Sequence, residues 1–202
     1  MRIATVFAVA VVLTAVMQAA EPRLPLGLEL YRPVPSDNRL TPAKVALGRR
    51  LFFDRRLSRD GSLSCAGCHD PKRALTDGRA VAQGVGGAMG TRNTPIIVNR
   101  AWGEGFFFDG RAATLEQLAL QPFLNPAELG MSPESLLSVL QARHRRQFRS
   151  TFGAEPSLEL AARALASYLR TIVAGDSPFD RYAAGPLRVE RIRAAGTTAV
   201  SR

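Results

Sequence analysis

The sequence predicts a mainly α-helical domain that is interrupted by long, irregular, glycine-rich loops. Residues suited to helix N-caps precede several stretches with helical apolar spacing, and no stretch shows the apolar–polar alternation of a half-buried strand. Hydrophobic residues make up 46% of the 202-residue chain, which is enough for a packed core. This composition argues against a disordered chain.

The N-terminal residues 1–20, "MRIATVFAVAVVLTAVMQAA", have the layout of a secretory signal peptide. Arg2 precedes an apolar run that is shorter than the roughly 20 residues needed to span a bilayer. Cleavage after Ala19 or Ala20 would leave a large residue at the third position back, so an uncleaved anchor is the alternative. Both interpretations predict export, and we expect a periplasmic protein.

The first helix is expected after a proline-rich lead-in. Residues 21–40 contain four prolines and are predicted to be extended. Thr41 is suited to be an N-cap, and Pro42 to the first helical position. The helix is predicted to end near Phe53 and to bury Val45, Leu47, Leu51 and Phe52.

A glycine-rich region follows, between residues 70 and 99, and its "GVGGAMGTRNTP" segment is incompatible with a regular helix. A long irregular segment inside a compact domain is usually functional or disordered, and wrapping a cofactor is one way to order it.

Helices are expected again in the second half of the chain. Thr114 is suited to cap a helix over 115–121, and Ser132 a helix from Pro133 to about Ala142. Between residues 158 and 173, helical spacing of three and four places one apolar stripe on Ala161, Leu165, Tyr168 and Ile172. Residues 186–202 lack this periodicity and are predicted to be an irregular basic tail.

The chemistry-bearing motif is "SCAGCHD", which holds both cysteines of the chain. A disulfide between Cys65 and Cys68 would close only a tiny loop, no βαβ pattern supports a thioredoxin-like site, and a zinc site lacks further ligands. C-x-x-C-H is the attachment signature of c-type haem. On a helix, Cys65, Cys68 and His69 share one face, so the thiols can bond to the vinyl groups of one haem while His69 reaches the iron as proximal ligand.

The other histidine, His144, lies in the charged stretch "QARHRRQFRS" and is expected to be solvated on a helix surface. The formal net charge is +10, and Lys44 and Lys72 are the only lysines among 27 basic residues. This arginine excess reflects either the base composition of the gene or a basic surface for an anionic partner or haem propionates. Nucleic acid is not expected as a partner of an exported haem protein.

The sixth position on the iron separates two functions. A second strong protein ligand would make an electron-transfer cytochrome, and Met89 in the glycine-rich loop is the candidate for it. An open position would permit peroxide chemistry.

Taken together, several motifs resemble one family. "LFFD", "SCAGCHD", "GTRNTP", "FDGRA", "NPAELGM" and "SPFDRY" occur in one order between Leu47 and Tyr182. In this they are similar to the N-terminal haem domain of bacterial di-haem cytochrome c peroxidases and the related MauG proteins. The resemblance implies that residues 41–185 form a c-type cytochrome-like haem domain. It implies periplasmic reduction of hydrogen peroxide to water, with electrons from a small donor cytochrome c or copper protein.

The resemblance also implies roles for single residues. Cys65, Cys68 and His69 match the haem attachment, and Glu128 matches an acid–base carboxylate on the distal face. In an apolar pocket such a carboxylate would have a raised pKa. Further expected site residues are an aromatic pair near the haem (Phe107 and Phe108), a residue associated with calcium (Asn93) and two arginines that could pair with haem propionates (Arg92 and Arg111).

The sequence departs from the family pattern in three places. Val85 stands where some members carry a distal histidine, which predicts an open iron. Leu118 stands where family members often carry a glutamine on the distal side of the haem, and Gln117 lies one position before it. The family continues into a second domain with a second C-x-x-C-H motif. We therefore expect a truncated or frameshifted gene product, and a true single-haem protein is the alternative. The expected partner is the missing haem domain or a second copy of the chain.

Overall fold

A computed structural model describes residues 24–28 and 31–185. The predicted signal peptide and the basic tail of residues 186–202 lie outside these ranges. Within them the chain is mainly helical, and its extended pairings are isolated bridges. None of the helices in the described ranges is long and apolar enough to cross a membrane.

The longer helices begin where the sequence predicts them. They are α1 (Pro42–Phe52), α3 (Leu115–Leu124), α4 (Pro133–Phe152) and α5 (Leu158–Leu169). Each begins after a capping hydroxyl that accepts a hydrogen bond of 3.1 to 3.3 Å from a backbone N–H three residues on. The caps are Thr41, Thr114, Ser132 and Ser157. These bonds satisfy N–H groups that have no partner inside the helix.

The predicted helix ends needed correction. α4 continues past Ala142 to Phe152, because buried residues recur every four positions along it, at Leu136, Leu140, His144 and Phe148. It ends at Gly153, which adopts the left-handed conformation with φ 67°. α3 passes through Pro122 to Leu124, and α5 ends at Leu169 rather than near residue 173.

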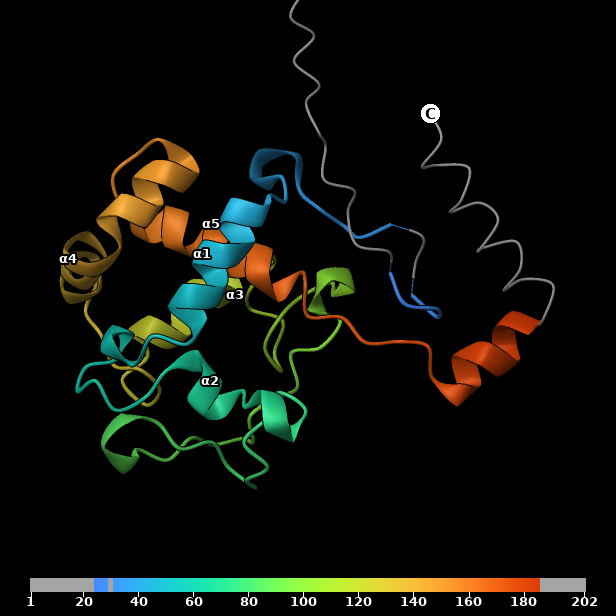
Figure 1. Cartoon of the computed structure of the whole chain (residues 1–202). Coiled ribbons are helices and arrows are strands. Elements are labelled where there is room, and N and C mark those ends of the chain that lie inside the picture. The colour runs from blue at the N-terminus through green and yellow to red at the C-terminus, as the bar shows by residue number, and fades with distance from the viewer. Residues whose placement is uncertain (1–23, 29–30, 186–202) are drawn as a thin grey trace, which may run out of the picture.

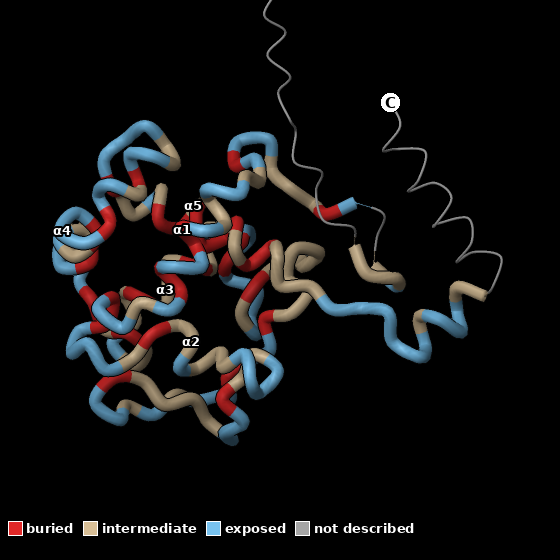
Figure 2. Tube along the Cα trace, viewed as in Figure 1, coloured by how far each residue is buried: buried red, intermediate tan, exposed pale blue. Residues whose placement is uncertain are grey.

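The core forms where α5 packs against α1 and α3, with α4 along one side (Figure 1). The inner face of α5 is built largely of small residues such as Ala161, Ala164 and Ala166. Gly48 of α1 lies against the carbonyl of Ala164 so closely that a Cβ atom there would overlap it. Small residues on both helices therefore let their backbones approach, and buried residues are concentrated at this contact (Figure 2).

The lead-in, predicted to be extended over residues 21–40, is not extended throughout. It contains the short turn η1 (Ser36–Asn38), and Asn38 is buried. The Asn38 amide donates to Glu116 Oε1 at 2.7 Å, and Arg170 Nη1 donates to the same oxygen at 2.7 Å. Lys44 Nζ donates to Asn38 Oδ1 at 3.0 Å. This buried polar network joins the lead-in to α1, α3 and the end of α5.

The prediction for His144 was wrong. Its side chain is buried, with 1% of the residue exposed, and Nε2 lies 2.7 Å from Asp54 Oδ2. His144 shares the buried face of α4 with Leu140 and Phe148, while its neighbours in the charged stretch face outward. The arginines on both sides of His144 led to the prediction of an exposed residue, although His144 continues the four-residue spacing of the buried positions.

The segment between α1 and α3 covers one end of the helical core and carries the cysteine motif. It contains the short helix α2 (Cys65–Cys68) and the single-turn helices η2 (Arg55–Leu57), η3 (Pro71–Arg73), η4 (Val85–Gly87) and η5 (Arg100–Trp102). As predicted, residues 84–95 form no regular α-helix. At the other end of the described chain, residues 178–185 form a short helix that stands away from the main body (Figure 1).

Candidate functional site

The cysteine motif lies on α2, with His69 at the C-terminal end of that helix. The His69 backbone N–H donates to Cys65 O at 2.8 Å. This last hydrogen bond of the helix places His69 one turn after Cys65. Cys65, Cys68 and His69 therefore share one short turn, as their spacing predicts. Cys65 also packs against the hydrophobic core.

The imidazole of His69 is oriented by a backbone carbonyl. Its Nδ1 lies 3.0 Å from Leu75 O. Ala74 and Leu75 both adopt positive φ, at 53° and 61°, and this turn brings the Leu75 carbonyl back to the ring. A histidine that donates Nδ1–H to a carbonyl presents Nε2 to a metal, which is the arrangement found for most metal-ligating histidines.

The protonation states of these side chains suit a haem ligand set. Burial lowers the pKa of His69, although the carbonyls of Leu75 and Pro95 and the charge of Asp77 act in the opposite direction. The ring is therefore neutral at neutral pH, as ligation requires. Burial raises the thiol pKa of Cys65 to about 12 and that of Cys68 to about 11. Reactive redox cysteines have depressed pKa values, so this environment argues against a thioredoxin-like site.

Glu128 lies in a tight turn after α3. Asn125 organises this turn: its carbonyl accepts from the N–H groups of Glu128 and Gly130, each at 3.0 Å. Gly130 closes the turn with φ 67°. The N–H groups of Leu129 and Met131 donate to the last carbonyls of α3, which fixes the turn against that helix.

The Glu128 carboxyl is partly buried and lies within electrostatic range of the cysteines. Burial raises its pKa, while a 2.7 Å hydrogen bond from the Asn125 amide and the charge of Arg111 partly oppose the rise. Its negative charge contributes to the raised pKa of both Cys65 and Cys68. The fold thus places this carboxyl within electrostatic range of two cysteines that lie about sixty residues earlier in the sequence.

The glycine-rich loop is held on the Glu128 turn. The Val85 N–H donates to Glu128 O at 2.9 Å, and the Val85 side chain is fully buried. Gly84 lies so close to the carbonyls of Ala127 and Glu128 that a Cβ atom would overlap them. Only glycine permits this approach, so Gly84 allows the loop to cover the turn.

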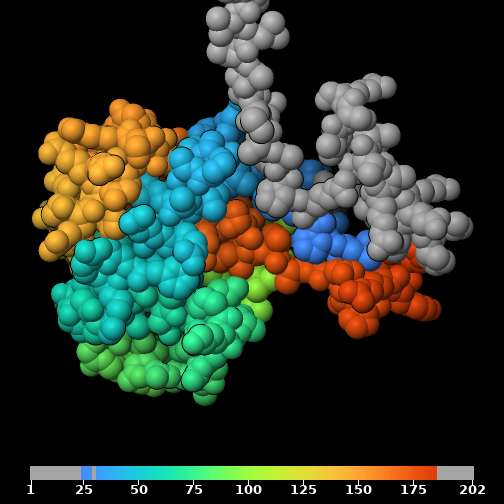
Figure 3. All heavy atoms as spheres, viewed as in Figure 1, coloured from blue at the N-terminus to red at the C-terminus, as the bar shows by residue number. Residues whose placement is uncertain are grey.

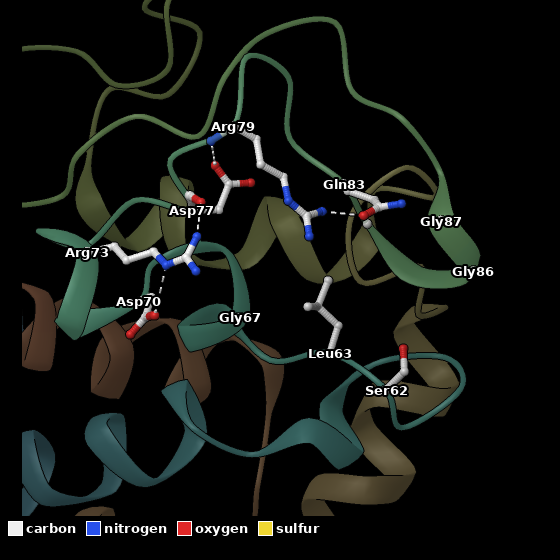
Figure 4. Close-up of a pocket in the computed structure, with 11 residues that line it drawn as sticks. Ser62, Leu63, Gly67, Asp70, Arg73, Asp77, Arg79, Gln83, Gly86 and Gly87 are labelled. Carbon is white, nitrogen blue, oxygen red and sulfur yellow. Dashed lines mark hydrogen bonds and ion pairs between the residues drawn. The ribbon is translucent and has the colours of Figure 1, made fainter.

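A hollow of about 450 Å³ opens beside α2 (Figure 4). Arg79 and Gln83 reach over it from the loop, and Leu63 points toward it from the opposite side. Arg79 Nη1 donates to Gln83 Oε1, and Arg73 Nη1 donates to Asp77 O at 3.1 Å. Sequence reasoning missed these arginines, because nothing in the sequence predicts which loop arginines lie close to α2.

The two arginines that the sequence did select are stacked on the two selected phenylalanines. Arg111 lies 3.6 Å from the ring centroid of Phe107 and also pairs with Asp109. Arg92 lies 5.0 Å from the ring centroid of Phe108, which is exposed. Phe107 has φ 64°, a conformation unusual for a bulky residue. Neither arginine lines the hollow beside α2.

Other predicted candidates lie elsewhere. Asn93 is exposed, and its amide makes a long 3.5 Å contact with Thr94 O. Calcium binding at Asn93 stays a prediction. Met89 is 58% exposed, and Met131 is buried in the core. Gln117 is exposed and accepts a 2.8 Å hydrogen bond from the Ala113 N–H.

Asn125 is a site residue that sequence reasoning missed. Its side chain accepts from the Ala127 N–H at 3.0 Å and donates to Glu128 Oε1, so one residue shapes the turn and contacts the carboxyl. The signal was present in the Asn-Pro pair, which favours turn initiation.

The residues around α2 fit a covalently bound haem. The donor set comprises two thiols one helical turn apart and a neutral imidazole with an oriented Nδ1. In the described ranges, no cluster of three or more His, Cys, Asp or Glu side chains forms a metal site that would compete for these residues.

Sequence comparison relates the chain to cytochrome c peroxidases and MauG proteins. The sequence model of a family described as di-haem cytochrome c peroxidase matches residues 42–187. The chain is 46% identical over 157 residues to methylamine utilization protein MauG of Methylorubrum extorquens, a match that covers 76% of this chain and 44% of that protein. It is 40% identical over 189 residues to cytochrome-c peroxidase IdrP1 of Denitromonas iodatirespirans, with coverage of 88% and 49%.

A solved structure of a MauG-like protein associated with microbial copper homeostasis matches with a TM-score of 0.70 and 34% identity. The match covers 78% of this chain and 49% of that one. The chain therefore spans about half the length of the relatives that it matches.

Proposed function

The chain belongs to the di-haem cytochrome c peroxidase family, whose members include haem-containing oxidoreductases, and from this premise we propose that it is a periplasmic haem peroxidase domain. The proposed reaction combines hydrogen peroxide with two electrons and two protons to give two water molecules. The electrons come from a small donor cytochrome c or copper protein. The observation that carries the proposal is the partly buried Glu128 carboxyl within electrostatic range of the C-x-x-C-H turn.

Cys65 and Cys68 would hold one haem c through thioether bonds, and His69 would face the iron through Nε2. When bound, the haem supplies the redox centre from which electrons pass to peroxide. The Leu75 carbonyl keeps the His69 ring in one orientation and one tautomer.

Glu128 is the proposed acid–base residue. As a carboxylate it can take a proton from one peroxide oxygen and return it to the other, so that water leaves. Burial raises its pKa toward the working range, and Asn125 holds Oε1 so that the second oxygen is available to the substrate. The loop around Gly84 and Val85 packs on the backbone of the turn that carries this carboxyl.

An electron-carrier function is less well supported. Met89, the candidate sixth ligand, exposes more than half of its surface, and Met131 is packed in the core.

The test is peroxide consumption by the haem-loaded protein. The chain is expressed with a cytochrome c maturation system, its haem content per chain is measured, and hydrogen peroxide loss is followed with a small artificial electron donor. We expect catalytic turnover that is lost in Glu128→Gln and kept in Glu104→Gln, since Glu104 is exposed. Haem-loaded protein that consumes peroxide no faster than Glu128→Gln would overturn the proposal.

A further inference from the structure

The Asp54–His144 pair joins two elements that lie far apart in the sequence. Asp54 follows α1, and His144 lies in the middle of α4, 90 positions later. Both side chains are buried, and Nε2 lies 2.7 Å from Oδ2. In the space-filling view, α4 lies directly against the residues that follow α1 (Figure 3). A buried polar contact at this place must satisfy groups that water cannot reach.

Asp54 in turn holds the segment that leads to the haem motif. Its Oδ1 accepts from the Arg56 N–H at 3.0 Å and from Arg56 Nε at 2.8 Å, which caps η2. Ser58, directly after η2, accepts at Oγ from the Leu63 N–H at 3.2 Å. The segment from Asp54 to Leu63 therefore enters α2 in one fixed path.

The same segment contacts the Glu128 turn. The Arg59 N–H donates to Leu129 O at 2.8 Å, and Leu129 directly follows Glu128. Gly130 of the turn also lies beside Arg59: a Cβ atom added to Gly130 would be 3.6 Å from Arg59 Cβ, an ordinary van der Waals distance. A continuous path of contacts thus runs from His144 through Asp54 and η2 to the turn that carries Glu128.

The geometry assigns one protonation state to the pair. Burial acts to raise the pKa of Asp54, but the hydrogen bonds from Arg56 and His144 outweigh it and lower that pKa to about 2. Asp54 is then a carboxylate that can only accept, so Nε2 of His144 carries the hydrogen. Nδ1 of His144 is buried and has no hydrogen-bond partner in the described part of the chain. A second proton on the ring would be buried without an acceptor.

We propose that His144 is a positioning residue for Glu128: through Asp54 it holds the segment of residues 54–59 in the conformation that supports the Glu128 turn. The catalytic part of this inference rests on the proposed peroxidase function, whereas the structural part does not. Protonation of His144 weakens the support, because the added hydrogen at Nδ1 has no acceptor. The charged groups that act on the ring are Asp54, Arg56 and Arg50.

The experiment compares His144→Phe, which removes the donor but keeps a flat ring, with His144→Gln, which can still donate to Asp54. Amide hydrogen exchange of the haem-loaded protein is measured for peptides that cover residues 54–63 and 125–131. Leu140→Ala is the matched control, because Leu140 lies one turn earlier on the same buried face of α4. We expect exchange in both peptides to rise about tenfold or more in His144→Phe, which corresponds to loss of one charge-assisted hydrogen bond.

The supporting pattern has three parts. First, His144→Gln exchanges as slowly as wild type in both peptides. Second, Leu140→Ala does not raise exchange specifically in these two peptides. Third, lowering the pH speeds exchange of residues 125–131 in wild type but not in His144→Gln. Unchanged exchange at residues 125–131 in His144→Phe would overturn the proposal, whatever the peroxide activity. If His144→Phe does not fold, the acid dependence in wild type and His144→Gln decides alone, and equal dependence in the two overturns it. Absence of peroxide turnover in wild type would refute the peroxidase function and leave the exchange result standing.

Discussion

The side-chain amide of Asn125 donates a 2.7 Å hydrogen bond to Oε1 of Glu128, three residues along the same turn. This bond partly offsets the effect of burial, which raises the pKa of the carboxyl. The balance between the two effects sets the pH at which Glu128 becomes a base.

Replacing Asn125 with Ala removes the donor and should raise the pKa of Glu128 further. If Glu128 accepts a proton from peroxide, the acid limb of the kcat/KM profile then moves to higher pH. The profile is measured on haem-loaded protein, with Gln141→Ala as the control amide, since Gln141 is exposed on α4. An unshifted acid limb in Asn125→Ala would show that Glu128 does not control the profile.

Replacing Glu128 with Gln should lower turnover by roughly 10²- to 10⁴-fold, the usual contribution of a positioned acid–base group. It should also stabilise the fold at neutral pH. The folded pKa is raised, so the folded state binds protons more tightly, and the wild-type stability falls as pH rises through that pKa. Denaturant unfolding at neutral and acid pH measures this. A variant that is less stable than wild type at neutral pH contradicts the prediction.

Replacing Glu116 with Gln should have the opposite pH dependence. Burial acts to raise the pKa of Glu116, but hydrogen bonds from Arg170 and Asn38 outweigh it, and the pKa is lowered. The carboxylate therefore contributes stability that is present above its unfolded pKa and lost as pH falls through the folded one. Leaving the Arg170 charge buried and unpaired should cost about 3 kcal/mol at neutral pH. Urea titrations of Glu116→Gln, compared with the exposed Glu155→Gln, test this. Equal losses in the two variants speak against a special role for the buried network.

Replacing Gly84 with Ala should displace the glycine-rich loop from the Glu128 turn. The added methyl group would overlap the carbonyls of Ala127 and Glu128, so the bond from the Val85 N–H to Glu128 O has to break. We expect lower stability, by about 1–3 kcal/mol as for other overpacked sites, and lower peroxide turnover. Gly90→Ala is the control in the same loop, because its Cβ would meet neighbours at 3.3 Å or more. Similar effects of the two substitutions would contradict the prediction.

The linear sequence by itself determined the elements whose cause is local. The C-x-x-C-H spacing places both thiols and His69 on one turn, and the capping hydroxyls at Thr41, Thr114 and Ser132 define where helices begin. These features depend on residues three or four apart, so one turn of backbone is enough to produce them. The order of the six motifs also sufficed to indicate the family, which the sequence comparisons bear out.

Only the tertiary structure decided which distant groups meet. The burial of His144 on Asp54, the support of the Glu128 turn by Arg59, and the approach of Arg79 to the hollow beside α2 all join residues from different segments. Local spacing carries no information on such pairs, because they depend on how α1, α4 and the loops pack together. His144 shows the reason most clearly: its charged neighbours along the chain are exposed, and the packing of one helix face buries the imidazole among them.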